Sequence, residues 1–239
     1  MNKVVLVTGA GRGLGAGLAK KLAEEGFDLA LHYCSSRAGV EQVQAFAEKK
    51  RRRALLIQAD LTVPAESERL RESIEQTFGQ LDVLVNNAGV YHEKQLDELT
   101  PQEWFEGLNT TATAVFFTTR AMLPLLRRSE HGRIVNIGDS SSDRASARDM
   151  AISYHIGKTG VWMLTRSFAQ LTAKDGITVN MISPGLLNNS VGLSGIEEIP
   201  AGRYGTFSDV YEALKLVIHS QSDYLTGSNL MVSGGWNLR

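Results

Sequence analysis

Short apolar runs alternate with longer amphipathic stretches along the entire chain. A short apolar run bounded by turn residues predicts a buried strand, and apolar residues three or four positions apart predict a helix. The predicted strands span 3–8, 28–33, 54–58, 82–85, 133–137, 177–182 and 229–232. The predicted helices between them span 13–25, 37–50, 64–78, 102–128, 151–174 and 208–219. Strict alternation demands right-handed crossovers, so we expect a parallel sheet covered by helices on both faces.

Length and composition fit one domain of this kind. The chain has 239 residues, of which 43% are hydrophobic and 21% are charged, as in an ordinary soluble globular protein. We therefore expect a single doubly wound α/β domain of Rossmann type over residues 1–239. In such a fold a ligand binds at the carboxyl ends of the strands.

Charge and cysteine content narrow the range of partners. The net charge is −1, which gives no reason to expect nucleic acid as a partner. Cys34 is the only cysteine, so an intrachain disulfide is impossible and a reducing compartment fits. The first apolar run is too short for a signal peptide or a membrane span. We expect a cytoplasmic protein without a membrane segment or a metal site, and Cys34 receives no role.

A glycine-rich turn, TGAGRGLG, joins the first predicted strand to the first helix at 8–15. Glycines let the backbone approach a pyrophosphate at the N-terminus of a helix, where free N–H groups point outward. This context predicts a dinucleotide site. Its cofactor-binding residues are predicted to be Gly9, Gly11, Arg12, Gly13, Leu14 and Gly15.

The end of the second strand indicates which dinucleotide is preferred. An NAD site usually has an acidic residue there to bind the ribose 2′-hydroxyl. This strand instead ends in HYCSSR, which places Tyr33, Ser35, Ser36 and Arg37 at the position and contains no acid. Hydroxyls and arginines suit a 2′-phosphate, and Arg12 adds a second cation, so we expect NADP(H). The two serines can also cap the next helix, and the two readings are compatible.

Tyr154 and Lys158 are four residues apart on a predicted helix and therefore share one face. A free tyrosine has a pKa near ~10, and a nearby ammonium lowers the pKa of the phenol. Tyr154 can then give a proton to a carbonyl oxygen while NADPH delivers hydride to the carbon.

Five segments, taken in order, resemble the signature segments of a known family. They are Thr8-Gly9 through Gly15, Asp60-Leu61, Asn86-Asn87-Ala88-Gly89, Tyr154 through Lys158, and Pro184-Gly185. In order and spacing they are similar to the short-chain dehydrogenase/reductase family, and the resemblance covers nearly the whole chain.

The resemblance implies roles for further residues. In the family the second segment contacts adenine, the third steadies the central strand and lines the adenine-ribose side, and the last lies beside the nicotinamide. These cofactor roles fall on Asp60, Leu61, Asn87, Ala88, Gly89, Pro184, Gly185 and Leu187. Lys158, with Tyr154 beside it, would also hold the nicotinamide ribose, and Asn109 would relay protons through water.

The family also places a serine just past the fifth strand, where it binds the substrate carbonyl. Counting from the strand, this position is Asp139. Counting back the usual interval from Tyr154, it is Ser141. A loop insertion after the site favours Asp139, and one before it favours Ser141, so both residues remain candidates, with Ser140 close by.

Asp139 also bears on the choice of branch. Pteridine reductases carry an aspartate there, but they usually have an arginine in place of Gly13 and a serine in place of Gly89. The 3-oxoacyl carrier-protein reductases match at both glycines but keep the serine. The leading hypothesis is an NADPH-dependent reductase of a ketone, possibly a 3-oxoacyl group. The alternatives are a pteridine or dihydropteridine reductase and a non-catalytic NADP-binding regulatory protein.

Two further expectations concern the substrate side and the assembly. The family uses the segment corresponding to 186–205 as a lid, here apolar at Leu186, Leu187, Val191, Leu193, Ile196 and Ile199, with Gly192, Gly195 and Gly202 allowing movement. The helices at 102–128 and 151–174 are apolar on more than one face, through Phe116, Phe117, Trp162, Met163 and Phe168. This surplus predicts a homo-oligomer that packs through these helices, and the family resemblance implies a homodimer or a homotetramer. The expected partner at this side of the site is a small-molecule carbonyl substrate.

Overall fold

The computed structural model describes residues 2–144, 146–190, 193 and 195–236. Seven strands form one sheet in the order β3-β2-β1-β4-β5-β6-β7, and every pair of neighbours is parallel. The strands are β1 (Val4–Val7), β2 (Asp28–Tyr33), β3 (Ala54–Gln58), β4 (Val83–Asn86), β5 (Arg133–Ile137), β6 (Thr178–Pro184) and β7 (Asn229–Val232). The predicted doubly wound α/β fold is confirmed. The strand order reverses between β1 and β4, which is where such sheets bind ligands.

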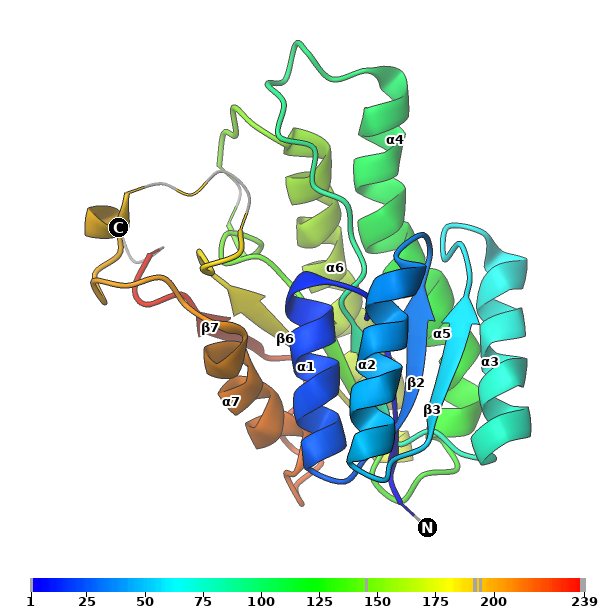
Figure 1. Ribbon diagram of the computed structural model, residues 1–239. Helices are drawn as coiled ribbons and strands as arrows, with labels where there is room; N and C mark the ends of the chain where they lie inside the picture. Colours follow the sequence, from blue (N-terminus) through cyan, green and yellow to red (C-terminus); the bar gives the residue numbers. More distant parts are fainter. Residues whose placement is uncertain (1, 145, 191–192, 194, 237–239) are drawn as a thin grey trace.

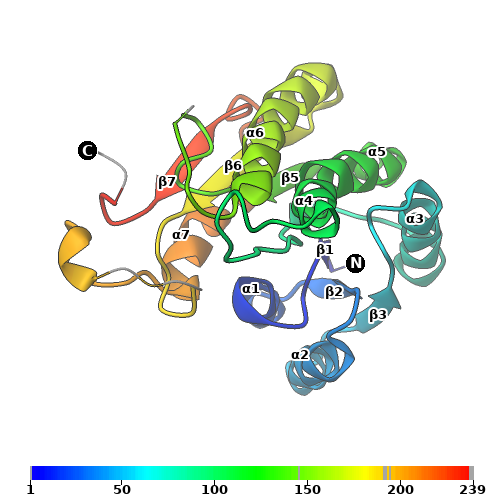
Figure 2. The same ribbon diagram turned by 90° about the horizontal axis from the view of Figure 1, so that it is seen from above.

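Helices cover both faces of the sheet, as Figure 2 shows from above. On one face lie α1 (Gly13–Glu24), α2 (Arg37–Lys49) and α7 (Phe207–Ile218), and on the other α3 (Pro64–Phe78), α5 (Ala114–Leu126) and α6 (Ile152–Thr172). Each layer buries its own apolar cluster against the sheet, because the strands are apolar on both sides. The short α4 (Pro101–Leu108) and the first turns of α6 stand above the carboxyl ends of the strands (Figure 1).

The starts of the helices follow local sequence signals. At α4 the Thr100 hydroxyl accepts from the Glu103 N–H at 3.2 Å, and the Glu103 carboxylate accepts from the Thr100 N–H at 2.9 Å. These two bonds form a capping box, with Pro101 in the first turn. A second box, from Thr206 to Asp209, starts α7 one residue before the predicted 208.

The prediction of a single α-helix over 102–128 is wrong in one respect, because the helix is interrupted. A π-helical segment, Asn109–Thr113, separates α4 from α5. The hydroxyls of Thr110 and Thr111 donate to the carbonyls of Glu106 and Gly107 at 2.7 Å each, and such back-bonding bends helices. The apolar spacing continues through the segment, so the pattern gives no sign of it. Such insertions occur frequently at functional sites.

A chain of buried amides and hydroxyls crosses the middle of the sheet. The Asn86 amide on β4 donates to Asn136 Oδ1 on β5 at 2.8 Å and to the Thr119 hydroxyl on α5 at 3.0 Å. The Asn136 amide donates to the Thr165 hydroxyl on α6 at 2.9 Å. These donors are satisfied although they are shielded from water, so this polar chain ties the two central strands to the helices on one face.

The outer faces of α5 and α6 are partly apolar. Met163 is 67% exposed and Phe116 is 38% exposed, whereas Phe168 is 6% exposed and packs in the core. The expectation that Phe168 contributes to an outer apolar face is therefore wrong. Among the helices of the described residues, none combines the length and the apolar content needed to span a bilayer. The same residues contain no group of three His, Cys, Asp or Glu side chains that could hold a metal ion.

Candidate active site

Two adjoining cavities open at the carboxyl ends of the strands. The larger has a volume of about 610 Å³ and lies over the ends of β1, β2 and β3. The smaller has a volume of about 420 Å³ and lies over the ends of β5 and β6 and the start of α6. Gly13, Asn87 and Gly89 line both cavities, so a long ligand can run from one into the other.

The glycine-rich turn and the Asn87 segment hold each other in place. The Thr8 hydroxyl accepts from the N–H groups of Asn87 at 2.9 Å and Ala88 at 3.0 Å, and the Asn87 amide donates to the Thr8 carbonyl at 2.9 Å. Gly9 has a φ of 65°, a conformation that favours glycine. A Cβ at Gly15 would collide with Gly9 and Asn87, so Gly15 acts through close packing and is absent from the lining of either cavity.

The N-terminus of α1 faces the larger cavity with unpaired donors. Arg12 occupies the capping position and makes no side-chain capping bond. The first N–H groups of a helix have no partner within the helix, and this end carries a partial positive charge. Gly11, Arg12 and Gly13 line the cavity here, so a phosphate would meet backbone donors and a guanidinium together.

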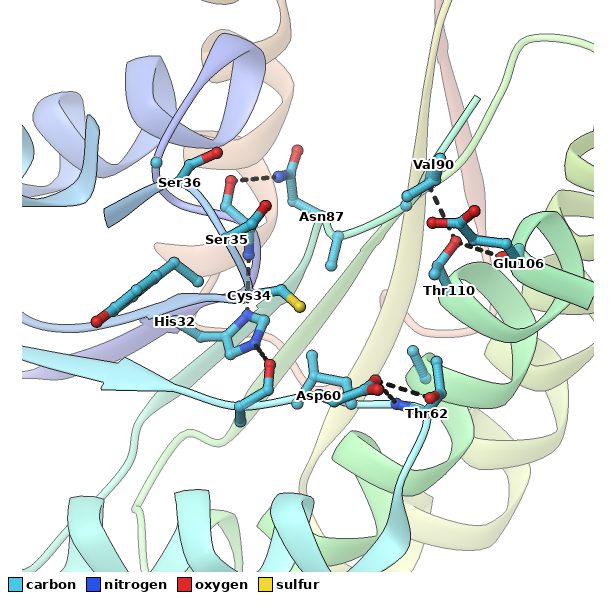
Figure 3. Close-up of a pocket in the computed structure, with 18 of the residues that line it drawn as sticks. His32, Cys34, Ser35, Ser36, Asp60, Thr62, Asn87, Val90, Glu106 and Thr110 are labelled. Carbon is cyan, nitrogen blue, oxygen red and sulfur yellow. Dashed lines mark hydrogen bonds between the residues drawn. The ribbon is translucent and has the colours of Figure 1, made fainter. Parts of the chain in front are cut away.

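His32, at the end of β2, buttresses this turn and was missed by the sequence reasoning. Its Nδ1 accepts from the Gly9 N–H at 3.1 Å, and its Nε2 lies 2.9 Å from the Ala59 carbonyl (Figure 3). An N–H must donate to a carbonyl, so the hydrogen is on Nε2. Burial lowers the pKa of His32 to about 4, and the ring is neutral. A single histidine at a strand end gives no sequence signal of this role.

Acidification is expected to destabilise the protein through His32. Its pKa is about 4 in the folded chain against 6.5 for an ordinary histidine, so between these pH values the unfolded chain binds a proton that the folded chain does not. The contribution of His32 to the free energy of unfolding is therefore fully present above pH 6.5. It falls by about 3 kcal/mol as the pH decreases to 4. Urea unfolding across this pH range checks the effect. His32→Asn should lose this part of the pH dependence, and identical slopes in the two proteins would contradict the prediction.

The outer end of the larger cavity contains hydroxyls and a cation at the predicted 2′-phosphate position. Ser35, Ser36, Cys34 and Asp60 line it (Figure 3). Arg12, Tyr33 and Leu61 also belong to the lining. Ser36 precedes α2 but makes no side-chain capping bond, so the capping role considered from the sequence is not used. Within the described part of the chain, neither serine hydroxyl has a hydrogen-bond partner, which leaves both available to a ligand.

Arg37 is placed differently from Arg12. Its side chain is 74% exposed, pairs with Glu41 at 2.9 Å on α2, and is not part of the cavity lining. Arg12 has no ion-pair partner among the described residues. Of the two predicted cations, Arg12 is therefore the one oriented for a ligand in the cavity.

Tyr154 and Lys158, on successive turns of α6, line the smaller cavity. Lys158 Nζ donates to the Ile137 carbonyl at 2.6 Å and lies 5.4 Å from the centre of the Tyr154 ring. Burial lowers the pKa of Lys158 to about 8, which still leaves it protonated at neutral pH. An ammonium has three N–H groups, so two remain for a ligand after the bond to Ile137.

The pKa of Tyr154 moves in the direction opposite to the sequence expectation. Burial of the phenol raises its pKa, and the negative charge of Asp139 and the nearby Tyr91 raise it further. These effects outweigh the neighbouring ammonium. Tyr154 is therefore a protonated phenol at neutral pH, which is the state that a proton donor requires.

Asp139 and Ser141 take distinct places in the loop after β5. Asp139 Oδ1 accepts from the Ser141 N–H at 2.9 Å and from the Ser141 hydroxyl. The sheet ladder continues on either side, with the Gly138 N–H donating to Ile182 and the Ser140 N–H donating to Pro184. The position of Asp139 is thus set by the strand, and the Ser141 hydroxyl is engaged with that carboxylate. Both residues, and Ser140, line the smaller cavity.

Three neighbours of Tyr154 and Asp139 were not identified from the sequence. The Tyr91 ring meets the Tyr154 ring edge-on with centres 5.1 Å apart, and His155 Nδ1 lies 3.8 Å from Asp139 Oδ1. Arg148 lines the same cavity. Tyr91 follows the Asn-Ala-Gly segment by two residues and His155 directly follows Tyr154, so proximity in sequence to these signatures was the available signal.

Asn109 and the loop 186–205 complete the predicted site residues. Asn109 lies in the π-helical segment, accepts from the Thr113 hydroxyl at 3.2 Å, and lines the larger cavity rather than the smaller. Pro184, Gly185, Leu186 and Leu187 line the smaller cavity, and a bridge between Leu187 and Gly205 closes the base of the loop. Val191 and Gly192 lie outside the described residues.

The fold and the paired cavities are those of an α/β oxidoreductase, and comparison with known proteins agrees. The family model of the short chain dehydrogenases matches residues 3–194. The chain belongs to the short-chain dehydrogenase/reductase family, as its signature segments predict. A relative, 3-oxoacyl-acyl-carrier-protein reductase FabG of Staphylococcus epidermidis, is 32% identical over 243 residues, covering 98% of this chain and 99% of the relative.

Solved structures show the same fold. The blue fluorescent protein from a metagenomic library, in complex with NADPH, has a TM-score of 0.89 and 31% identity, and the match covers 98% of each chain. Acetoin dehydrogenase from Enterobacter cloacae also has a TM-score of 0.89, with 28% identity over 100% of this chain and 96% of its own. The whole described fold is therefore shared with these two proteins.

Proposed function

We propose that the protein is an NADPH-dependent reductase that converts a carbonyl group, in a ketone or a 3-oxoacyl compound, into an alcohol. The main support is the grouping of Tyr154, Lys158 and Asp139 around a cavity that is continuous with the larger one. The similarity to 3-oxoacyl-acyl-carrier-protein reductases and to an NADPH-bound protein agrees with this activity.

The residues of the larger cavity fit NADPH. The donors at the start of α1 suit the pyrophosphate, and Arg12, Ser35 and Ser36 suit the 2′-phosphate. The two unused N–H groups of Lys158 suit a ribose hydroxyl. When bound, NADPH supplies the hydride for the carbonyl carbon.

Tyr154 supplies the proton in the proposed reaction. As hydride reaches the carbonyl carbon, negative charge develops on the oxygen, and the phenol hydroxyl donates to that oxygen. An alkoxide is a stronger base than a phenolate, so the transfer is favourable even though burial raises the pKa of Tyr154. The Lys158 ammonium stabilises the phenolate that remains. Asn109 is proposed to help return the proton through water.

Asp139 motivates a second candidate, the reduction of a pteridine or a related heterocycle. An ionised carboxylate accepts hydrogen bonds and cannot donate one to a substrate carbonyl. Ser141 occupies Oδ1, so Oδ2 is left to accept from an N–H of the substrate. Ring N–H groups occur in pteridines and are absent from simple ketones. Gly13 and Gly89, which depart from the pteridine reductase pattern, favour the carbonyl reductase.

One assay distinguishes these candidates. NADPH oxidation is measured with ketones, β-ketoesters, quinones and biopterin as substrates. Turnover of a ketone or β-ketoester supports carbonyl reduction, and turnover of biopterin alone supports the second candidate. Tight NADPH binding without turnover of any substrate would indicate the non-catalytic regulatory protein.

The preference for NADPH over NADH should depend on Arg12. Arg12→Ala is expected to weaken NADPH binding by about 10–100-fold and to leave NADH binding nearly unchanged, because it removes a charge-assisted bond to the 2′-phosphate. Arg37→Ala is the matched control and should erode the preference less, since Arg37 is paired with Glu41 outside the cavity. Titration of both nucleotides measures the effect, and equal or tighter NADH binding by the wild type would refute it.

The protein is proposed to form a homodimer or homotetramer through α5 and α6. Met163, 67% exposed on α6, would be buried in such an interface. Met163→Glu should shift the mass toward the monomer, because a carboxylate is costly in an apolar contact. Light scattering at micromolar concentration measures the mass, with Lys49→Glu on α2 as a control. A monomeric wild type would contradict the proposal.

A further inference from the structure

The imidazole of His32 connects three strand ends at the floor of the larger cavity. Its Nδ1 accepts from Gly9 at 3.1 Å beyond β1, and its Nε2 donates to Ala59 at 2.9 Å beyond β3. Its own carbonyl, at the end of β2, accepts from the Ala10 N–H at 2.9 Å. His32 is 2% exposed, so water does not replace these bonds. Figure 3 shows the ring between the glycine-rich turn and the segment that contains Asp60.

Both backbone polar groups of Gly9, the N–H and the carbonyl, are hydrogen-bonded to side chains. Its N–H donates to His32, and its carbonyl accepts from the Asn87 amide at 3.2 Å. Because glycine has no Cβ, Gly9 could adopt many other conformations at little cost, and these two bonds select the one with a φ of 65°. The orientation selected at Gly9 determines where the following N–H groups, up to the start of α1, point.

We propose that His32 is a positioning residue for the cofactor. By accepting from Gly9 through Nδ1, it holds the phosphate-binding turn in the conformation that receives the pyrophosphate of the dinucleotide. The inference rests on the proposed function, in which the larger cavity binds NADPH. The proposed role requires the tautomer with the hydrogen on Nε2. A hydrogen on Nδ1 would leave the Gly9 N–H facing another donor.

Two substitutions separate the two bonds of the ring. In His32→Asn the side-chain oxygen can take the place of Nδ1 and accept from Gly9. In His32→Gln the longer amide reaches the place of Nε2 and can donate to Ala59, while Gly9 loses its acceptor. Dissociation constants of NADPH and NADH are measured for both variants by the fluorescence of the nucleotides.

The expected result is a difference between the variants. His32→Asn should bind both nucleotides within about threefold of the wild type, and His32→Gln should bind both at least about tenfold more weakly, because a buried donor is left without a partner. The loss must be equal for NADPH and NADH, since both contain the pyrophosphate. Arg12→Ala, in contrast, should affect NADPH alone.

A control separates affinity from general stability. The Thr172 hydroxyl is buried at the end of α6 and donates at 3.0 Å to the carbonyl of Ile177, just before the start of β6 and away from the carboxyl ends of the strands. Thr172→Val should lower the midpoint of thermal unfolding without changing either dissociation constant. A loss of nucleotide affinity in Thr172→Val equal to that in His32→Gln would overturn the inference, because affinity would then only follow stability.

A measurement on the wild type does not depend on how the variants fold. The ¹⁵N chemical shifts of the His32 ring in the NADPH complex should show a hydrogen on Nε2 and a free Nδ1. A hydrogen on Nδ1 would overturn the inference, and so would equal nucleotide affinity of the Asn and Gln variants. A wild type that binds neither nucleotide would overturn the proposed function and this inference with it.

Discussion

Tyr154→Phe is expected to lower kcat for ketone reduction by about 10²–10⁴-fold, the usual contribution of a general acid. The substitution removes one hydroxyl and keeps the ring that packs edge-on against Tyr91. Binding of NADPH should be unaffected, because the pyrophosphate and 2′-phosphate contacts proposed above lie in the larger cavity. Steady-state rates of NADPH oxidation and a nucleotide titration on the same preparation measure the two quantities.

Tyr91→Phe is the matched control for this experiment. It removes a phenol hydroxyl from the same cavity, 5.1 Å away between ring centres, but from a residue to which no proton transfer is assigned. It should change kcat by no more than about threefold, well below the effect of losing a general acid. Near-normal turnover by Tyr154→Phe, or an equal loss in both variants, would remove Tyr154 from the proposed role.

Asp139→Ser is expected to preserve or raise kcat/KM for a simple ketone, by up to about tenfold, because it restores a hydroxyl that can donate to the carbonyl. It also removes the negative charge that raises the pKa of Tyr154. A neighbouring charge shifts a pKa by about 1–3 units, so the decline of the rate at high pH should begin at a lower pH in the variant. Ser141→Ala should cost the ketone reaction little, since that hydroxyl serves the Asp139 carboxylate.

Asp139→Asn distinguishes charge from hydrogen bonding. The amide keeps an oxygen for the Ser141 N–H but carries no charge, so it should shift the pH profile as Asp139→Ser does without restoring the hydroxyl. A severe loss in Ser141→Ala together with a mild effect of Asp139→Ser would instead make Ser141 the carbonyl-binding residue. Near-wild-type activity in both Asp139→Ser and Ser141→Ala, with the pH profile unchanged in Asp139→Ser, would leave Ser140 as the candidate.

The fold could be predicted from the sequence because its signals are local and repeated. Each strand is an apolar run that ends at polar or glycine residues, and the capping box at Thr100 marks a helix start. The break in the helix at Asn109 was not predicted from the sequence, because it arises from threonine hydroxyls that donate to the carbonyls of the preceding turn. Apolar periodicity does not report such a competition.

The site was accessible from the sequence where spacing alone determines geometry. Tyr154 and Lys158 are four residues apart, so they share a face of the helix wherever that helix begins or ends. Asp139 and Ser141 could not be separated by counting, because the length of the connection to α6 is not fixed by any pattern. The ladder bonds to β6 supply that information in three dimensions. The pKa of Tyr154 likewise depends on burial, which a spacing of four residues does not convey.

The buried pair of Asn86 and Asn136 has a consequence for how the chain finds its native alignment. The strands on which it lies, Val83–Asn86 and Arg133–Ile137, are mostly aliphatic, and aliphatic side chains pack almost equally well in shifted alignments. The two asparagines stand directly opposite each other. A slip by one position would place Asn86 opposite Val135 or Ile137 and leave its amide without this partner in an apolar layer. Each unpaired group would cost about 1–3 kcal/mol of stability. The pair thus disfavours misaligned pairings of the two strands, which a sheet centre made only of aliphatic side chains would tolerate.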